Sequence, residues 1–166
     1  QEIGKLYYKR AVVPEDAVNL EINTIDAADA SNKMACAAIY ARFQRQCGDF
    51  SCQLVFSRSK IIPDQMTQPR AELFAATLNT HTGEIVKRAF GDNHVGKVKL
   101  TDSQVVLHWI SNPDKPVKQW VRNRIVEINR FTKSSDWMFV NSKDMIADIG
   151  TRRVTDLNMV NRDSVW

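Results

Sequence analysis

The stretch from Val98 to Ile110 constrains the fold of this chain more than any other. Apolar residues alternate with lysine in Val98–Leu100, which predicts a short strand, and then recur at helical spacing. Ser103 can cap that helix, because its hydroxyl can accept a backbone N–H of the first turn. Asp102 is therefore predicted at the carboxyl end of a strand, where open α/β sheets bind ligands. Its carboxylate could hold a metal ion there or only assist the cap.

The length of 166 residues predicts one domain with a substantial core. A hydrophobic share of 43% and a charged share of 25% are typical of soluble globular proteins. No segment has the length of a membrane span, and no charged, apolar leader is recognisable. The chain begins at Gln1 without methionine, so we expect a piece of a longer protein, or one processed from it.

The net charge of +4 weakly favours a polyanionic partner, because Lys and Arg neutralise phosphates. Three cysteines, an odd number without C-x-x-C spacing, argue against a disulfide framework and against a zinc site. We therefore expect a reduced, intracellular protein.

Three strands are predicted in the first part of the chain, over residues 20–31, 34–43 and 51–60. Their short connections predict that they pair antiparallel. Residues 1–19 have little periodicity and are interpreted as a linker, or alternatively as an edge segment of the same domain. Residues 154–166 are polar and are interpreted as a tail, which leaves residues 20–153 as the domain.

A helix is predicted to open at Thr67, whose hydroxyl can cap it, and to carry Glu72 in its first turn. Residues 79–97 are expected to be irregular, although 84–90 could hold part of a helix or strand. A second helix over 117–130 has a basic face that either is solvated or faces phosphates. A strand over 137–140 and a short helix over 145–153 follow.

Four acidic residues fall at strand ends or in the first turns of helices: Asp29, Glu72, Asp102 and Asp148. Carboxylates that converge from different elements can hold hard divalent cations such as magnesium. Because the chain has 19 acidic residues, four at such positions are easily found. It becomes informative only when the surrounding residues also match a known pattern.

The surrounding residues do match one. The chain resembles the ribonuclease H domain of retroelement Pol polyproteins, and most closely that of the BEL/Pao class of LTR retrotransposons. The resemblance covers residues 20–153 and is carried by Asp29-Ala-Ser31, Pro69-Arg-Ala-Glu-Leu73, Thr101-Asp-Ser-Gln-Val-Val-Leu-His-Trp109, Val121-Arg-Asn-Arg-Ile-Val-Glu-Ile128, Val140-Asn-Ser-Lys143, Ala147-Asp148 and Thr151-Arg152.

The resemblance implies an α/β, ribonuclease H-like fold with a mixed five-stranded sheet flanked by helices. It implies hydrolysis of the RNA strand of RNA–DNA hybrids during reverse transcription, by two Mg²⁺ ions or by Mn²⁺. Asp29, Glu72, Asp102 and Asp148 would be the catalytic, metal-binding residues. The implied partner is the reverse transcriptase domain of the same polyprotein, inside cytoplasmic retroelement particles. Neither a membrane nor a small-molecule cofactor is expected.

Binding of the hybrid is expected to rest mainly on phosphate contacts, and RNA is expected to be recognised by its 2′-hydroxyl and by the A-like shape of the hybrid. The candidate contacts are small polar and basic residues near the four acids or on the basic helix: Ser31, Asn32, Lys33, Arg70, Ser103, Lys118, Arg122 and Lys143.

Two positions qualify the resemblance. Phe139 stands near the place where the family often has a histidine that aids proton transfer or product release. Asp26 competes with Asp29, but residues three apart on a strand face opposite sides, and Asp29 is followed by Ala30-Ser31.

Two other functions are compatible with the sequence. An integrase-like polynucleotidyl transferase would use similar acids on DNA, but its last acid usually lies on a long helix. A weak or inactive scaffold module that still binds nucleic acid is favoured only by Phe139.

Overall fold

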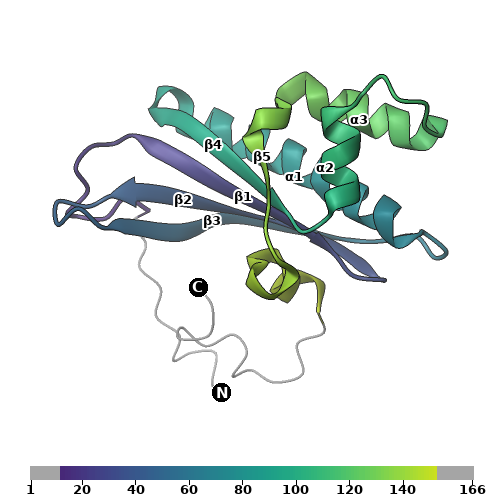
Figure 1. Ribbon diagram of the computed structural model, residues 1–166. Coiled ribbons are helices and arrows are strands. Elements are labelled where there is room, and N and C mark those ends of the chain that lie inside the picture. The colour runs from purple at the N-terminus through teal and green to yellow at the C-terminus, as the bar shows by residue number, and fades with distance from the viewer. Residues whose placement is uncertain (1–11, 153–166) are drawn as a thin grey trace, which may run out of the picture.

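A mixed five-stranded sheet forms the centre of the computed structural model, which describes residues 12–152 (Figure 1). The strands are β1 (Ile22–Ala30), β2 (Met34–Gln44), β3 (Phe50–Ile61), β4 (His94–Thr101) and β5 (Trp137–Phe139). Their spatial order is β3-β2-β1-β4-β5. The first three strands pair antiparallel, whereas β4 runs parallel to β1 and β5 parallel to β4. The predicted mixed sheet with three antiparallel strands first is confirmed.

Three α-helices cover one face of the sheet, and a short 3₁₀ helix lies on the other (Figure 1). The helices are α1 (Gln68–Phe90), α2 (Gln104–Ser111) and α3 (Gln119–Phe131), and the 3₁₀ turns are η2 (Gly91–Asn93), η3 (Ser134–Asp136), η4 (Ser142–Asp144) and η5 (Ile146–Thr151). Alternation along β1 separates the faces: Ala28 packs against α1, and Ala27 packs against Ala147 of η5.

Alanines let α1 approach the sheet closely. Ala28, Ala35 and Ala37 of the strands pack against Ala71 and Ala75 of the helix. A second cluster of larger side chains joins α1, α2, α3 and β5, and consists of Leu73, Ala76, Val106, Ile110, Val121, Ile125, Ile128 and Trp137. The N-terminal part of α1 is thereby held firmly beside the ends of β1 and β4.

Helix α1 is longer than its sequence indicates: the irregular structure expected over residues 79–97 is wrong for 79–90, and of the alternatives left open for 84–90 the helix is right. The helix continues to Phe90 with Asn79, Thr80 and Thr82 fully buried. The two threonine hydroxyls donate to carbonyl oxygens one turn earlier, and Asn79 bonds to Lys99. Buried polar residues that are satisfied in this way interrupt the apolar periodicity without interrupting the helix.

Two local predictions at the ends of helices are also wrong. Thr67 precedes α1, but its hydroxyl makes no capping hydrogen bond; its carbonyl accepts the N–H groups of Arg70 and Ala71 instead. Glu72 is the fifth residue of α1 and so lies beyond the first turn. The short helix predicted over residues 145–153 is the 3₁₀ helix η5 (Ile146–Thr151).

Residues 12–18 pack against the domain. Ala17 bridges to Arg45, whose guanidinium pairs with Asp16 at 2.7 Å, and Val12 and Val13 contact a cluster around Phe43. The proposed division at residue 19 stays a prediction; residues 1–11 and 153–166, including the proposed tail, lie outside the described residues. Cys36, Cys47 and Cys52 are unpaired. Within residues 12–152, no helix combines the length and the apolar character needed to cross a membrane.

Candidate active site

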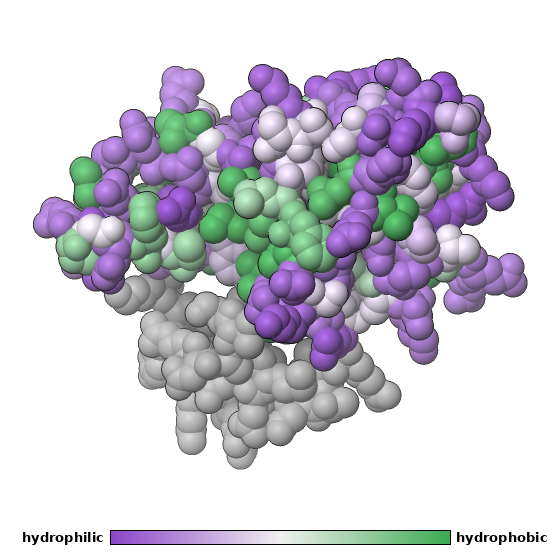
Figure 2. Space-filling model, viewed as in Figure 1, coloured by the Kyte–Doolittle hydropathy of each residue, from purple (hydrophilic) through white to green (hydrophobic). Residues whose placement is uncertain are grey.

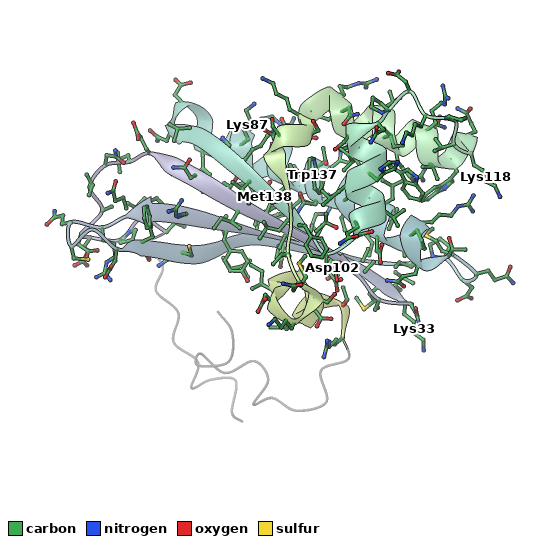
Figure 3. All side chains as sticks on the ribbon, in the orientation of Figure 1. Lys33, Lys87, Asp102, Lys118, Trp137 and Met138 are labelled. Atoms are coloured by element: carbon green, nitrogen blue, oxygen red, sulfur yellow. The ribbon has the colours of Figure 1, made fainter. Side chains whose placement is uncertain are left out.

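The parallel pairing of β1 and β4 brings Asp29 and Asp102 to the same edge of the sheet. Ala28 of β1 pairs with Thr101 of β4, and each aspartate is the residue that follows. Figure 3 shows Asp102 where β4 has ended and the chain turns into α2. This edge is where parallel strands offer their carboxyl ends to ligands.

Asp29 is the most buried of the four candidate acids, with 8% of its surface exposed. Burial raises its pKa above the usual value of 3.8, and the nearby carboxylates of Asp102 and Asp148 raise it further. A hydrogen bond from the Thr151 hydroxyl to Oδ2 of Asp29, 2.8 Å long, opposes that rise. Asp102 and Asp148 therefore both lie within electrostatic reach of Asp29.

Asp148 of η5 carries its own counter-ion. The guanidinium of Arg152, one turn later, donates from Nε to Oδ1 of Asp148 at 2.8 Å and makes a second ion-pair contact with Oδ2. The preceding residue, Thr151, lies 2.9 Å from the backbone oxygen of Asp148 as well as contacting Asp29. Two consecutive residues thus contact two acids that come from opposite ends of the chain.

Asp102 is not the cap of α2. The Ser103 hydroxyl accepts the backbone N–H of Val106 at 3.2 Å, so it caps the helix as predicted. Asp102 instead accepts a hydrogen bond from the Ser142 hydroxyl, 2.7 Å from Oδ2. The Asp102 carboxylate is therefore bonded to Ser142 at the end of β4 and takes no part in the helix cap.

Glu72 lies on α1 and is not among the charges that raise the pKa of Asp29. Gln68 connects its helix to β1: its side-chain amide donates to the Ala30 carbonyl oxygen at 2.9 Å and to Oε1 of Glu72 at 3.2 Å. Within residues 12–152, no three Asp, Glu, His or Cys side chains form a group compact enough to hold a metal ion. Among the described residues, the four acids therefore do not form a closed ligand cage.

Asp26, the alternative candidate to Asp29, lies on the opposite face of the sheet. It is fully buried, and Oδ2 accepts a 2.7 Å hydrogen bond from the ammonium group of Lys99. The same ammonium group bonds Oδ1 of Asn79 at 2.7 Å. Asp26 therefore belongs to a buried ion pair under α1, and the preference for Asp29 is consistent with this placement.

The predicted nucleic-acid contacts lie in the β1–β2 turn, in the cap of α2, or elsewhere on the surface. Ser31 accepts the backbone N–H of Met34 in the β1–β2 turn, beside the exposed Asn32 and Lys33. Ser103 is buried, and its hydroxyl is used by the helix cap. Figure 3 shows Lys33 and Lys118 toward the same end of the molecule. The remaining predicted residues are Arg122 and Lys143, which are exposed, and Arg70, which is half-buried.

Phe139 lies on β5 with 44% of its surface exposed, paired with Thr101 next to Asp102. Figure 2 shows hydrophobic residues gathered in the middle of this side of the protein, and Met138 and Val98 are exposed as well. A phenyl ring can neither donate nor accept a proton. This position beside Asp102 is therefore apolar and contributes no group for proton transfer.

Sequence reasoning gave no role to Ser142, Thr151 or Arg152. The spacing of Asp148 and Arg152, four residues apart with opposite charges, is a recognisable signal of an ion pair on one helical face. The two hydroxyl partners have no comparable signal, because Ser142 and Asp102 are 40 residues apart and Thr151 and Asp29 are 122 apart.

The sequence matches the family model of the Pao retrotransposon-like RNaseH-like domain over residues 2–103, more than half of the chain. The chain belongs to this family. No curated protein matches it. This membership agrees with the resemblance stated from the local motifs, and it adds the region before residue 20 to the matched part.

The chain is similar to solved ribonuclease H structures, one of which reaches a TM-score of 0.50 and supports the fold. The N-terminal RNase H domain of rv2228c from Mycobacterium tuberculosis superposes with a TM-score of 0.50 at 13% identity, covering 75% of this chain and 86% of that one. RNase H1 from the halophilic archaeon Halobacterium salinarum gives 0.46 at 14% identity, covering 76% and 90%. LC11-RNase H1, in a complex with RNA/DNA hybrid, gives 0.47 at 17% identity, covering 77% and 91%.

Proposed function

We propose that this chain is a metal-dependent endoribonuclease that hydrolyses the RNA strand of RNA–DNA hybrids during reverse transcription. One observation carries the proposal: in a ribonuclease H-like fold, Asp29 and Asp102 directly follow paired residues of β1 and β4, and the charges of Asp102 and Asp148 raise the pKa of Asp29. Carboxylates brought together in this way repel one another unless a cation joins them.

The donor set fits hard divalent cations such as Mg²⁺ or Mn²⁺, because every candidate ligand is a carboxylate oxygen. Asp29, Asp102 and Asp148 would hold the metal, with Glu72 reaching them from α1. The bound ions would supply an activated water and would stabilise the leaving 3′ oxygen of the cleaved bond.

The other residues of the site would hold these ligands in place. Ser142 donates to one oxygen of Asp102, and Thr151 donates to one oxygen of Asp29, so these two hydroxyls would orient the carboxylates for a ligand. Arg152 neutralises Asp148 and must give up at least one contact before that carboxylate binds a cation. Phe139 supplies no proton, so water or substrate groups would carry out any transfer made by a histidine elsewhere in the family.

We expect the activity to act beside a reverse transcriptase domain of the same polyprotein, within intracellular retroelement particles, and membership of a retrotransposon family supports this expectation. Two alternatives are kept as outcomes of the test. A catalytically weak or inactive nucleic-acid-binding module is favoured by the apolar Phe139 and by the ion pair on Asp148. An integrase-like enzyme is less consistent with the structure, because Asp148 lies on a 3₁₀ helix of six residues.

The decisive measurement is cleavage of an end-labelled RNA–DNA hybrid with Mg²⁺ or Mn²⁺ and then with excess EDTA. We expect metal-dependent cutting of the RNA strand only, and none of matched RNA–RNA or DNA–DNA duplexes. Asp102→Asn and Glu72→Gln should lower the rate by at least about 10²-fold, since a metal-ligand contact contributes several kcal/mol to the transition state. Binding without cleavage would favour the inactive module, and cutting of DNA would favour the integrase-like alternative.

Arg152→Gln should make the protein bind Mg²⁺ more tightly, because the substitution removes the guanidinium that competes for Asp148. The Mg²⁺ concentration giving half of the maximal thermal stabilisation should fall about two- to fivefold, the range expected from an exposed ion pair. Thermal unfolding in a Mg²⁺ series measures this without catalysis. Arg45→Gln is the matched control, because it breaks an exposed pair with Asp16 and should leave the midpoint unchanged. An equal midpoint in Arg152→Gln and the wild type would contradict the competition.

A further inference from the structure

Three residues on adjacent strands form a cross-strand row on the face of the sheet opposite the α-helices. The buried Cys36 of β2 pairs with Asp29 of β1 on one side and with Ser59 of β3 on the other. Directly paired residues of neighbouring strands point to the same face of a sheet. A candidate metal ligand, a thiol and a hydroxyl therefore lie in line on the face that η5 covers (Figure 1).

Consecutive residues of η5 contact this row. The backbone oxygen of Gly150 accepts a hydrogen bond from the Ser59 hydroxyl at 3.3 Å, and the next residue, Thr151, donates to Oδ2 of Asp29 at 2.8 Å. Gly150 itself lies against Cys36: a Cβ added at this glycine would collide with Sγ of Cys36 and would lie 3.1 Å from its Cβ. The 3₁₀ helix therefore touches all three members of the row.

Glycine is required at residue 150 for space and not for backbone conformation. Among the glycines of the described chain, only Gly48 and Gly91 have a positive φ, so the backbone of Gly150 would accept any side chain. An alanine at such a position usually stabilises a protein slightly, because it restricts the unfolded chain. The contact with Cys36 reverses that expectation, since Sγ already occupies the place of a methyl group.

The placement of η5 matters because this helix carries Asp148. A 3₁₀ helix of six residues has few hydrogen bonds of its own, and their geometry is poor, so contacts with the sheet set its position. Asp148 lies two residues before Gly150, and its charge reaches Asp29. A shift of η5 would therefore move Asp148 and Thr151 together, relative to Asp29.

We propose that Cys36, Ser59 and Gly150 position Asp148 for metal binding. The contact between the thiol and the glycine sets how closely η5 approaches the sheet, and the hydrogen bond from Ser59 holds the helix over β2 and β3. All three are positioning residues, because they act through Asp148 and not by touching the metal ion or the substrate. This inference rests on the proposed function in that Asp29 and Asp148 are taken as metal ligands.

The competing explanation is that these contacts contribute only to stability. Met145 and Ala147 pack against Ala27 in an apolar cluster, so this segment is held to the sheet in any case. A role in stability alone predicts a lower free energy of unfolding and an unchanged metal affinity of the folded protein. A positioning role predicts weaker metal binding under conditions in which the variant is still folded.

The test is a Mn²⁺ titration of the whole folded chain, in which the EPR signal of the free ion measures binding. Gly150→Ala should weaken Mn²⁺ binding by about 10- to 100-fold, the usual effect of losing a group that orients a metal ligand. The double variant Cys36→Ala/Gly150→Ala should recover most of the affinity, because the new methyl group takes the place of the deleted sulfur. Cys36→Ala alone should weaken binding less than Gly150→Ala, since a small gap displaces η5 less than a collision does.

Gly83→Ala is the matched control. A Cβ at Gly83 would lie 2.5 Å from Oδ2 of Asp26, on the opposite face of the sheet, so this variant also introduces a methyl group into filled space. It should lower the free energy of unfolding, measured in urea with EDTA, and should leave the Mn²⁺ affinity unchanged.

The outcomes separate this inference from the proposed function. Unchanged Mn²⁺ affinity in folded Gly150→Ala would overturn the positioning role, and so would a double variant that binds as weakly as Gly150→Ala. A wild type that binds no Mn²⁺ would overturn this inference together with the proposed metal site. A wild type that binds Mn²⁺ with the expected variant effects, but cuts no RNA, would overturn the nuclease and leave the positioning role standing.

Ser59→Ala decides the matter if Gly150→Ala does not fold. This variant removes one hydrogen bond of an exposed side chain and should weaken Mn²⁺ binding by about two- to tenfold, the range expected from the net contribution of a hydrogen bond. An affinity equal to that of the wild type would then overturn the positioning role.

Discussion

Asp29→Asn is expected to abolish cleavage of the hybrid and, in EDTA at neutral pH, to make the protein more stable than the wild type. The cleavage rate should fall at least about 10²-fold, because a metal-binding carboxylate is lost. The stability gain should be on the order of 1 kcal/mol, the usual size when a strained functional residue is replaced by a neutral one. Hybrid cleavage with Mg²⁺ and thermal unfolding with EDTA measure the two effects on the same preparation.

The stability gain follows from the direction of the pKa change. Burial and two neighbouring carboxylates raise the pKa of Asp29 in the folded protein, so folding disfavours its charged form. The stability of the wild type should therefore fall as the pH rises from about 3.8 through the raised pKa, because the native state binds more protons than the unfolded state in that window. Asparagine does not titrate, so the advantage of the variant should appear at neutral pH and vanish at acid pH.

Mg²⁺ provides the control for this prediction. It should stabilise the wild type, whose carboxylates it joins, and should stabilise Asp29→Asn much less. A variant that is less stable than the wild type in EDTA at every pH would show that Asp29 is mainly structural. A variant that keeps its cleavage rate would exclude Asp29 from the catalytic set.

The sequence predicts the fold well where one face of an element is apolar. Alternation along residues 51–60 and helical spacing along 104–110 identify β3 and α2 with small errors at their ends. The order of the sheet follows from short connections for β1 to β3 and from the resemblance for β4 and β5. Periodicity fails in α1 after Leu78, where Asn79, Thr80 and Thr82 are buried.

Gly83 gives a structural reason why hydrophobic periodicity does not identify this part of α1. A Cβ added at this residue would lie 2.5 Å from Oδ2 of Asp26 and 2.9 Å from Nζ of Lys99. The helix passes so close to the buried ion pair that only glycine fits. A glycine within a run of polar residues is typical of a loop. The sequence around Gly83 therefore predicts irregular structure, although its glycine and polar residues in fact accommodate a buried ion pair.

The candidate site was likewise only partly predictable from the sequence. The positions of Asp29 and Asp102 at strand ends follow from periodicity and parallel pairing, and choosing them among 19 acidic residues required the resemblance. The partners that orient them were not predictable, because hydrogen bonds such as that between Ser142 and Asp102 form only after distant segments meet. The metal-binding and catalytic roles of the four acids stay predictions until the variants are measured.

Asp26→Leu is expected to cost about 3–5 kcal/mol of folding stability, because it leaves the ammonium group of Lys99 buried without its carboxylate partner. Lys99 is 1% exposed, and burial already lowers its pKa while the charge of Asp26 opposes that change. Asn79 alone would remain as a side-chain acceptor. Urea unfolding of the variant, compared with the wild type at the same pH, measures the loss.

The double variant Asp26→Leu/Lys99→Met tests whether the charge, rather than the new shape, causes that loss. Replacing both partners of a buried pair by apolar side chains is often nearly neutral, so the double variant should recover most of the stability. Arg45→Met, which breaks the exposed pair with Asp16, should cost no more than about 1 kcal/mol. A double variant as unstable as Asp26→Leu would assign the loss to packing against Gly83. Strand β1 directs Asp26 toward α1 and Asp29, three residues later, toward η5. We therefore expect replacement of Asp26 to reduce stability and replacement of Asp29 to remove activity.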